Sequence, residues 1–248
     1  MLGLPAFVLS FPSRLPSRLP SSVFRLSRGL IDAAAAVLIG PLCAACREPL
    51  DHPTRGAVCN ECWTAVAPLT PRGIEAFPPH IHAAAAIGPY DGRLRDVIQA
   101  LKYDRRPTIA KHLARLMRDA GVGVLEGADG VVPVPLHRSR ERTRGFNQAA
   151  ELALHLGVPV QNVLLRTRKT ATQADLPAGK RHANVRGAFT SRGRCGIRGK
   201  VLVLVDDVCT TGATLNACAE VLLEAGAVNV RALVAARAPL IKANARPR

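Results

Sequence analysis

The segment Val201–Thr214 reads VLVLVDDVCTTGAT and decides the fold. Lys200–Val205 is almost wholly Val and Leu without alternation, which is typical of a central parallel strand buried on both faces. A helix is expected to follow over Thr214–Ala225, and Val228–Ala235 has the composition of another strand. A strand, a helix and a second strand imply a right-handed parallel crossover. The segment therefore predicts an α/β domain built on a parallel sheet.

The same α/β pattern extends toward the amino terminus as far as about residue 83. Strands are expected at Ala83–Tyr90 and Gly130–Pro135. A helix is expected around positions 94 to 101, because Leu94, Val97, Ile98 and Leu101 recur at helical spacing. A second helix is expected to begin at Pro107 and run to Gly121, and a third to span Phe146–Leu156. These elements supply further strands for the sheet and helices to cover it.

Four parts of the chain are expected to differ in structure. Residues 1–25 are rich in Pro, Ser and Arg and resemble a transit peptide in composition, so they are expected to be disordered or to precede the true start. Residues 26–80 would hold an amphipathic helix and a cysteine segment, residues 81–240 the α/β domain, and residues 241–248 a tail. No apolar run is long enough to span a bilayer, so no membrane span is expected.

The chain is strongly basic, with a formal net charge of +16. Such a charge favours polyanionic partners, among them nucleic acid and phosphorylated small molecules. The positive residues are spread along the chain, however, and an aromatic content of 4% argues against a stacking surface for single-stranded nucleic acid. Charge alone therefore leaves nucleic-acid binding open. The seven cysteines form no disulfide framework, which indicates a reducing, cytoplasmic environment.

Four of the cysteines form a metal-binding pattern. Cys43-x-x-Cys46 is followed by twelve residues and then by Cys59-x-x-Cys62. Two such pairs can place four thiolates tetrahedrally around one ion, which suits structural zinc. A redox CxxC would come singly, and a site with four protein ligands is closed, so no catalysis is expected there. A role in gripping DNA or a protein partner is the alternative to stabilising the fold.

Asp206 and Asp207 follow the buried strand, and the loop Thr210–Thr214 leads into the next helix. In open α/β sheets ligands bind beyond the carboxyl ends of the strands. A helix N-terminus preceded by Gly212 suits a phosphate group, because glycine lets the backbone approach it closely. Two adjacent carboxylates can accept hydrogen bonds from sugar hydroxyls. A simple helix N-cap is the alternative, but a cap needs one Asp or Thr and not two Asp and three Thr.

Two polar stretches are further candidates for ligand contact. A strand ends in the loop Pro133–Gly145, which carries four arginines whose forked donors suit a diphosphate. A solvated basic loop is the alternative. Arg166–Arg186 is a long polar segment that is either functional or a disordered surface loop. Lys102 and Tyr103 would end a helix and are expected to be exposed to solvent. Core packing of Tyr103 is as plausible as a ligand contact.

The loop around Asp206 resembles the loop of type I phosphoribosyltransferases that binds 5-phosphoribosyl diphosphate (PRPP). The whole chain resembles the ComF family of bacterial competence and uptake proteins over roughly residues 40–238. The other matching segments are the double CxxC, Leu101–Tyr103, Val132–Arg138, Arg144–Gln148, Gln173, Arg181 and Asn184–Val185. The resemblance implies an α/β, type I phosphoribosyltransferase fold, with a parallel sheet flanked by helices and a small amino-terminal zinc segment that has four cysteine ligands.

The resemblance also implies roles for single residues. Asp206 and Asp207 would hold the ribose 2′- and 3′-hydroxyls, and Thr210–Thr214 the 5′-phosphate. The arginine loop would face the diphosphate, with Mg²⁺ held mainly by substrate oxygens and water. The residues expected to bind PRPP are Asp206, Asp207, Thr210, Thr211, Gly212, Ala213 and Thr214, and those expected to be catalytic are Asp206, Asp207 and Arg138. Arg166–Arg186 resembles the lid that closes over PRPP.

Two classes of function compete on this basis. The first is a PRPP-binding phosphoribosyltransferase-like enzyme. Its acceptor substrate is not identified by the resemblance, because the zinc segment occupies the place of the hood domain with which related enzymes recognise a purine or pyrimidine base. The second is a non-catalytic module that senses PRPP or binds DNA, with single-stranded DNA or DNA-uptake proteins as partners, as the ComF resemblance implies. A zinc-knuckle adaptor for a protein partner is a third interpretation.

Overall fold

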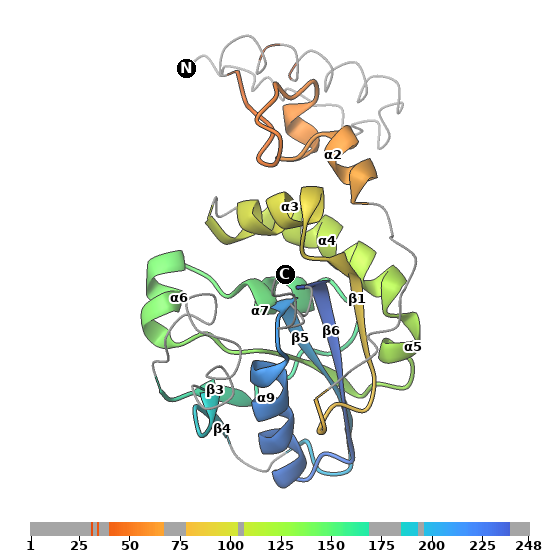
Figure 1. Ribbon diagram of the computed structural model, residues 1–248, viewed down its shortest axis with the longest axis vertical. Helices are drawn as coiled ribbons and strands as arrows, with labels where there is room; N and C mark the ends of the chain where they lie inside the picture. The colour runs from red at the N-terminus through yellow and green to blue at the C-terminus, as the bar shows by residue number, and fades with distance from the viewer. Residues whose placement is uncertain are drawn as a thin grey trace, which may run out of the picture.

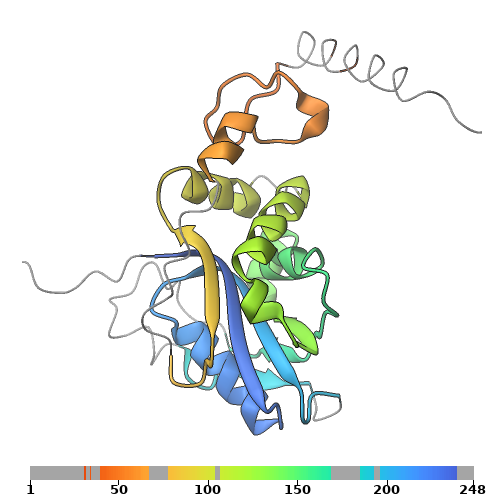
Figure 2. The same cartoon turned by 90° about the vertical axis from the view of Figure 1, so that its right-hand side faces the viewer.

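The computed structural model describes residues 31, 34, 40–66, 78–103, 107–168, 185–192 and 196–238. In this part of the chain a parallel sheet is covered by helices on both faces (Figure 1). The cysteine segment lies at one end of the molecule, and helix α3 (Gly92–Tyr103) lies between it and the sheet in both views (Figures 1 and 2).

The described residues form strands and helices that alternate along most of the chain, and the two longest strands, β5 and β6, lie in the middle of the main sheet. The described strands are β1 (Ala84–Pro89), β2 (Gly130–Pro133), β3 (Leu164–Arg166), β4 (Phe189–Ser191), β5 (Val201–Cys209) and β6 (Asn229–Arg237). The described helices are η1 (Pro53–Arg55), α2 (Asn60–Ala65), α3, α4 (Pro107–Ala120), α5 (Val122–Leu125), α6 (Arg138–Arg144), α7 (Gln148–Ala153) and α9 (Ala213–Glu224). The expected strands near residues 84, 130, 201 and 229 are thus confirmed, as are the expected helices near residues 94, 107, 148 and 213.

The main sheet has the strand order β1-β6-β5-β2, and each neighbouring pair is parallel. The central strand β5 is buried on both faces. Val203 and Val205 belong to a hydrophobic cluster shared with α3, α4 and α7. Leu202 and Leu204 belong to a second cluster shared with α9. The apolar run without alternation therefore predicted this position correctly, because a strand covered on both faces buries consecutive side chains.

Two segments differ from expectation. The sequence placed the end of the central strand at Val205, but β5 continues through both aspartates, because β6 pairs with it as far as Cys209 opposite Arg237. The arginine-rich stretch expected as a loop forms helix α6 instead. His137 caps this helix, since its Nδ1 accepts a hydrogen bond from the backbone N–H of Ser139 at 3.2 Å.

Helix α7 begins where the sequence predicted an anchored helix start. Asn147 caps it by accepting from the N–H of Ala149, and its Nδ2 donates to the carbonyl of Val134 at 3.0 Å. The helix ends at Ala153, earlier than the expected Leu156. The bond from Asn147 ties the helix to the chain just beyond β2, at the carboxyl edge of the sheet.

The cysteine segment packs on the α/β part through one continuous core. Cys43 and Cys62 are buried in the same hydrophobic cluster as Leu94 of α3. Trp63 of α2 stacks on His112 of α4, with ring centroids 3.9 Å apart and ring planes 15° apart. The expected domain boundary at residue 80 stays a prediction, and the amphipathic helix expected before residue 40 lies outside the described residues, apart from residues 31 and 34. No described helix is both long and apolar enough to cross a membrane.

Candidate functional site

Asp206 and Asp207 lie near the end of β5, before the chain leaves the sheet for α9. Successive side chains of a strand point to opposite faces. Asp207 therefore shares the face of Val205 and meets helix α3, whereas the charge of Asp206 acts on Cys218, which is buried in α9. The two carboxylates are neighbours in sequence but serve opposite sides of the sheet edge.

Asp207 forms an ion pair with Lys102 at the end of α3. The Nζ atom of Lys102 lies 3.2 Å from Oδ2 of Asp207, and the two side chains are only 15% and 13% exposed. Burial is the largest single effect and would lower the pKa of Lys102. The charge of Asp207, its hydrogen bond to Lys102 and the charges of Tyr90 and Asp206 together outweigh burial, so the pKa of Lys102 is raised. The exposed look that the sequence suggested for Lys102 is wrong. Tyr103 ends the helix as expected, and its side chain lies outside what the structure describes.

Asp206 is in a different electrostatic environment from Asp207. The pKa of the Asp206 carboxyl is raised to about 7, mainly by burial and in addition by the negative charge of Asp207. The backbone N–H of Asp207, which donates to Oδ1 of Asp206 at 2.9 Å, and the charges of Lys102 and Arg166 act in the opposite direction. Near neutral pH the site therefore holds one ion-paired carboxylate and one carboxyl close to its point of half-protonation.

The loop after β5 needs a glycine at one position. Gly212 is the N-cap of α9 and has a φ of 76°, in the left-handed region. A Cβ atom there would lie 2.5 Å from Cγ of Pro78. The segment that contains Pro78 is held on α9 by the backbone N–H of His80, which donates to Oδ1 of Asn216 at 3.3 Å. Oγ1 of Thr211 accepts from the N–H of Ala213 at 3.4 Å and completes a tight turn into the helix.

A Gly212→Ala variant is expected to be less stable than the wild type by more than ~1 kcal/mol, since the left-handed backbone alone costs an L-residue about that much. The contact with Pro78 adds to this cost. Urea denaturation would measure it. Gly123→Ala is the matched control, because a Cβ at Gly123 meets nothing within 4 Å. Equal stability of the two variants would contradict the strained turn.

The arginines are arranged differently from the sequence expectation. Arg138, expected to be catalytic, is exposed on α6, and no described contact tests its role. The guanidinium whose charge acts on Asp206 is that of Arg166 in β3, which also lies over the ring of Phe189 at 5.2 Å. Burial lowers the pKa of Arg166, and the positive charge of Arg140 lowers it further. Arg140 on α6 thus lies near Arg166, whose own charge reaches Asp206, an approach of α6 to β3 that sequence spacing does not reveal.

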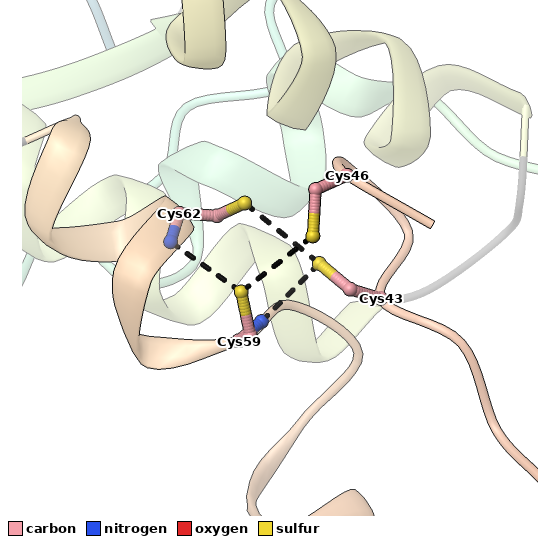
Figure 3. Close-up of side chains that lie close together, drawn as sticks. All are labelled: Cys43, Cys46, Cys59 and Cys62. Carbon is pink, nitrogen blue, oxygen red and sulfur yellow. Dashed lines mark hydrogen bonds between the residues drawn. The ribbon is translucent and has the colours of Figure 1, made fainter. Parts of the chain in front are cut away.

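The four cysteine thiols converge as the sequence predicted (Figure 3). Their sulfur atoms all lie within 4.8 Å of one another, with 3.9 Å between Cys43 and Cys62 and 3.8 Å between Cys46 and Cys59. A zinc ion about 2.3 Å from each ligand in a tetrahedron needs sulfur atoms about 3.8 Å apart. The cluster therefore fits zinc in both donor type and size.

The protonation of the thiols agrees with a cation-binding role. Burial opposes ionisation of Cys43, but backbone N–H groups of Cys46, Cys59 and Ala45 prevail and lower its pKa to about 6. Burial and the neighbouring sulfur atoms raise the pKa of Cys62 well above its usual range. Four thiolates cannot coexist here without a compensating positive charge, which a metal ion supplies.

Some residues expected to contact a ligand lie outside the residues that the structure describes. The lid expected over Arg166–Arg186 is described only at residues 166–168 and 185–186, so Gln173, Lys180 and Arg181 lie outside the described residues. Arg168, at the first end of this segment, donates to the carbonyl of Arg186 at 2.6 Å. The lid stays a prediction from sequence.

Comparisons with a protein-family model and with curated relatives agree on one family. Residues 142–244 match the phosphoribosyl transferase domain family. The chain is 34% identical to the DNA utilization protein YhgH of Escherichia coli K12 over 218 residues, spanning 77% of this chain and 94% of that protein. It is 35% identical to competence protein F of Haemophilus influenzae over 165 residues, 61% of this chain and 71% of that one. A glutamine PRPP amidotransferase from B. subtilis aligns at 26% identity over 50% of this chain and 25% of its own length, with a TM-score of 0.34, too low to add to the assignment.

Proposed function

Because this chain belongs to the ComF family of competence and DNA-utilization proteins and carries a phosphoribosyltransferase-type domain, we propose that it binds PRPP at the carboxyl edge of its sheet. The observation that carries the proposal is the pair Asp206 and Asp207 at the end of the central strand, directly before a glycine-capped helix. Ligands of open α/β sheets bind at this edge. The site would lie between the end of β5 and the start of α9.

The ribose and the 5′-phosphate have separate partners in this proposal. Asp206 and Asp207 would accept from the ribose hydroxyls, one from each side of the strand end. Residues Thr210–Thr214 would hold the 5′-phosphate, since α9 has twelve residues and its first turn directs backbone N–H groups at the loop. Gly212 fits this role, because a glycine in the left-handed region lets the backbone approach a phosphate closely.

The diphosphate would lie toward Arg140 and Arg166. Two guanidinium groups whose charges act on each other favour an anion between them. Arg138 on α6 remains a candidate for the same group. Mg²⁺ would neutralise the diphosphate from substrate oxygens and water, because Asp207 is already paired with Lys102 and the raised pKa leaves Asp206 only partly ionised at neutral pH.

In a transfer reaction an acceptor nucleophile forms a bond to the anomeric carbon of the ribose as the bond to diphosphate breaks. The aspartates would orient the sugar, and the arginines would stabilise the negative charge that grows on the leaving diphosphate. Non-catalytic sensing of PRPP uses the same contacts without an acceptor. The acceptor is therefore the feature that separates an enzyme from a sensor.

Calorimetric titration with PRPP and Mg²⁺ tests the proposed function. We expect saturable heat that ribose 5-phosphate, which lacks the diphosphate, reproduces only weakly. Gradual heat that PRPP and ribose 5-phosphate share equally would mean that the site does not recognise PRPP.

DNA binding is a second candidate function. The relatives are named for DNA utilization and competence, and Arg138 and Arg142 are exposed on α6, on a chain with a net charge of +16. Contact with phosphates would dominate, because aromatic residues are scarce, so affinity for single-stranded DNA should fall steeply with salt. DNA binding that survives an excess of PRPP would indicate a separate surface.

We also propose that the cluster of four cysteines holds one structural zinc ion. Its sulfur geometry supports this, and four protein ligands would leave no open position for catalysis. A reducing, cytoplasmic setting would keep these thiols available to the metal.

A further inference from the structure

The ion pair between Lys102 and Asp207 joins two elements that are 105 positions apart in the chain. Asp207 and Gln148 are the buried polar side chains of the described residues, and Asp207 is the one that carries charge. Its partner comes from α3, the helix that follows β1 at the carboxyl edge of the sheet. A charge in this position is retained only when it is paired, because burial of a lone carboxylate is costly.

We propose that Lys102 is a positioning residue of the phosphoribosyl site. Its ammonium group holds the Asp207 carboxylate on the α3 side of the sheet edge, so that Asp206 and Asp207 present acceptors to opposite sides of the bound sugar. This inference rests on the proposed PRPP site and adds to it a residue from outside the Val201–Thr214 motif.

Helix α3 gives Lys102 a fixed starting point. Leu94, Val97, Ile98 and Leu101 of this helix are all within 5% of complete burial, so the backbone that carries Lys102 cannot shift without disturbing the core. The Nζ atom also lies 5.8 Å from the ring centroid of Tyr90, within the range of a cation–π contact. Gln99 donates to the hydroxyl of Tyr90 at 2.6 Å and holds that ring in place.

The charge of Lys102 reaches both aspartates. The titratable groups that act on Lys102 are Asp207 and Asp206 of β5 and Tyr90 after β1. Arg166 from β3 acts on Asp206. The charge of Lys102 works against the rise in the pKa of Asp206. Loss of this charge should raise the pKa of the Asp206 carboxyl further, so that it keeps a proton to higher pH.

The test compares Lys102→Met, Lys102→Arg and the control Lys111→Met, which removes a lysine exposed on α4. PRPP affinity in the presence of Mg²⁺ is measured by calorimetry from pH 6 to pH 9. We expect Lys102→Met to bind at least about tenfold more weakly at pH 7, the loss typical of one charge-assisted hydrogen bond. Its affinity should recover as the pH rises. Lys102→Arg should recover most of the affinity, and Lys111→Met should match the wild type.

A second readout does not depend on PRPP. Carbon NMR of the aspartate carboxyls in the ligand-free protein, assigned with the single Asp206→Asn and Asp207→Asn variants, should show Asp206 titrating at higher pH in Lys102→Met than in the wild type. Unchanged titration together with unchanged PRPP affinity and pH profile would overturn the role of Lys102. A wild type that titrates as expected but fails to bind PRPP would overturn the proposed function instead, and would reduce the ion pair to a structural one.

Discussion

The double variant Asp206→Asn, Asp207→Asn is expected to lose at least about a hundredfold in PRPP affinity, because two hydrogen bonds to ionised acceptors are together worth roughly 3 kcal/mol or more. The amides keep the size of the carboxyl groups, and both positions are paired in β5, so the strand should persist. Calorimetry at pH 8 gives the affinity, and circular dichroism checks the fold.

Asp129→Asn is the matched control for this variant. Oδ2 of Asp129 accepts from the N–H of Val201 at 2.8 Å, so this carboxylate lies at the amino end of the same strand, far from the proposed ligand. It removes one negative charge but should leave PRPP affinity unchanged. A folded double variant with wild-type affinity would show that PRPP binds elsewhere.

The same site predicts a pH dependence. The pKa of Asp206 is raised to about 7. The ionised carboxylate, which accepts hydrogen bonds, is therefore largely lost as the pH falls below 7 and is fully formed well above pH 7. PRPP affinity should therefore increase from pH 6 to pH 8. The phosphate groups of PRPP titrate in the same range, so the informative quantity is the difference between the wild type and Asp206→Asn. The variant should show a flatter pH profile, and identical profiles would contradict an effect of Asp206.

Removal of zinc is expected to unfold the cysteine segment. Binding of structural zinc by small domains is worth about 10–16 kcal/mol, and this free energy is folding free energy. The wild type should contain one zinc ion per chain, and Cys62→Ser should contain far less, because Cys62 is buried among the other sulfur atoms. Elemental analysis of freshly prepared, reduced protein measures the ion.

Trp63 offers a direct signal for this unfolding. It is the single tryptophan of the chain and stacks on His112 of α4, so its fluorescence reports whether the cysteine segment is docked on the α/β part. Chelation of the metal should shift its emission toward that of exposed tryptophan. Cys195→Ser removes a thiol outside the quartet and should keep the zinc. Zinc-free protein with unchanged Trp63 emission would refute a structural metal.

Measuring PRPP binding alongside zinc content also tests whether the cysteine segment supports the proposed ligand site through α3. Cys62 and Leu94 of α3 share one hydrophobic cluster, and α3 carries Lys102 at its other end. Undocking of the segment should therefore loosen the helix that supports Asp207. PRPP affinity should fall in Cys62→Ser even though the cysteines lie outside the ligand site.

Much of the site could be predicted because it is continuous in the chain. Val201–Val205 indicates its burial by composition, since a run of five β-branched and aliphatic residues suits a strand covered on both faces. Thr210–Thr214 follows within a few positions, so the strand, the loop and the helix appear in order. The cysteine quartet is equally local, because a CxxC pair closes on one ion without help from the rest of the fold.

The sequence by itself thus determined the α/β class, the acidic strand end and the convergence of four cysteines that fit a metal ion, all of which depend on short-range spacing. Only the tertiary structure decided how the two aspartates differ. Pairing with β6 carries β5 through both of them and turns them to opposite faces, where α3 brings Lys102 to Asp207 and β3 brings the charge of Arg166 to Asp206. These partners are about 105 and 40 positions away along the chain, and no local period records which distant charge a fold will bring to a carboxylate. Burial and Coulomb interactions act through space, so the protonation of this site is a property of the packed molecule.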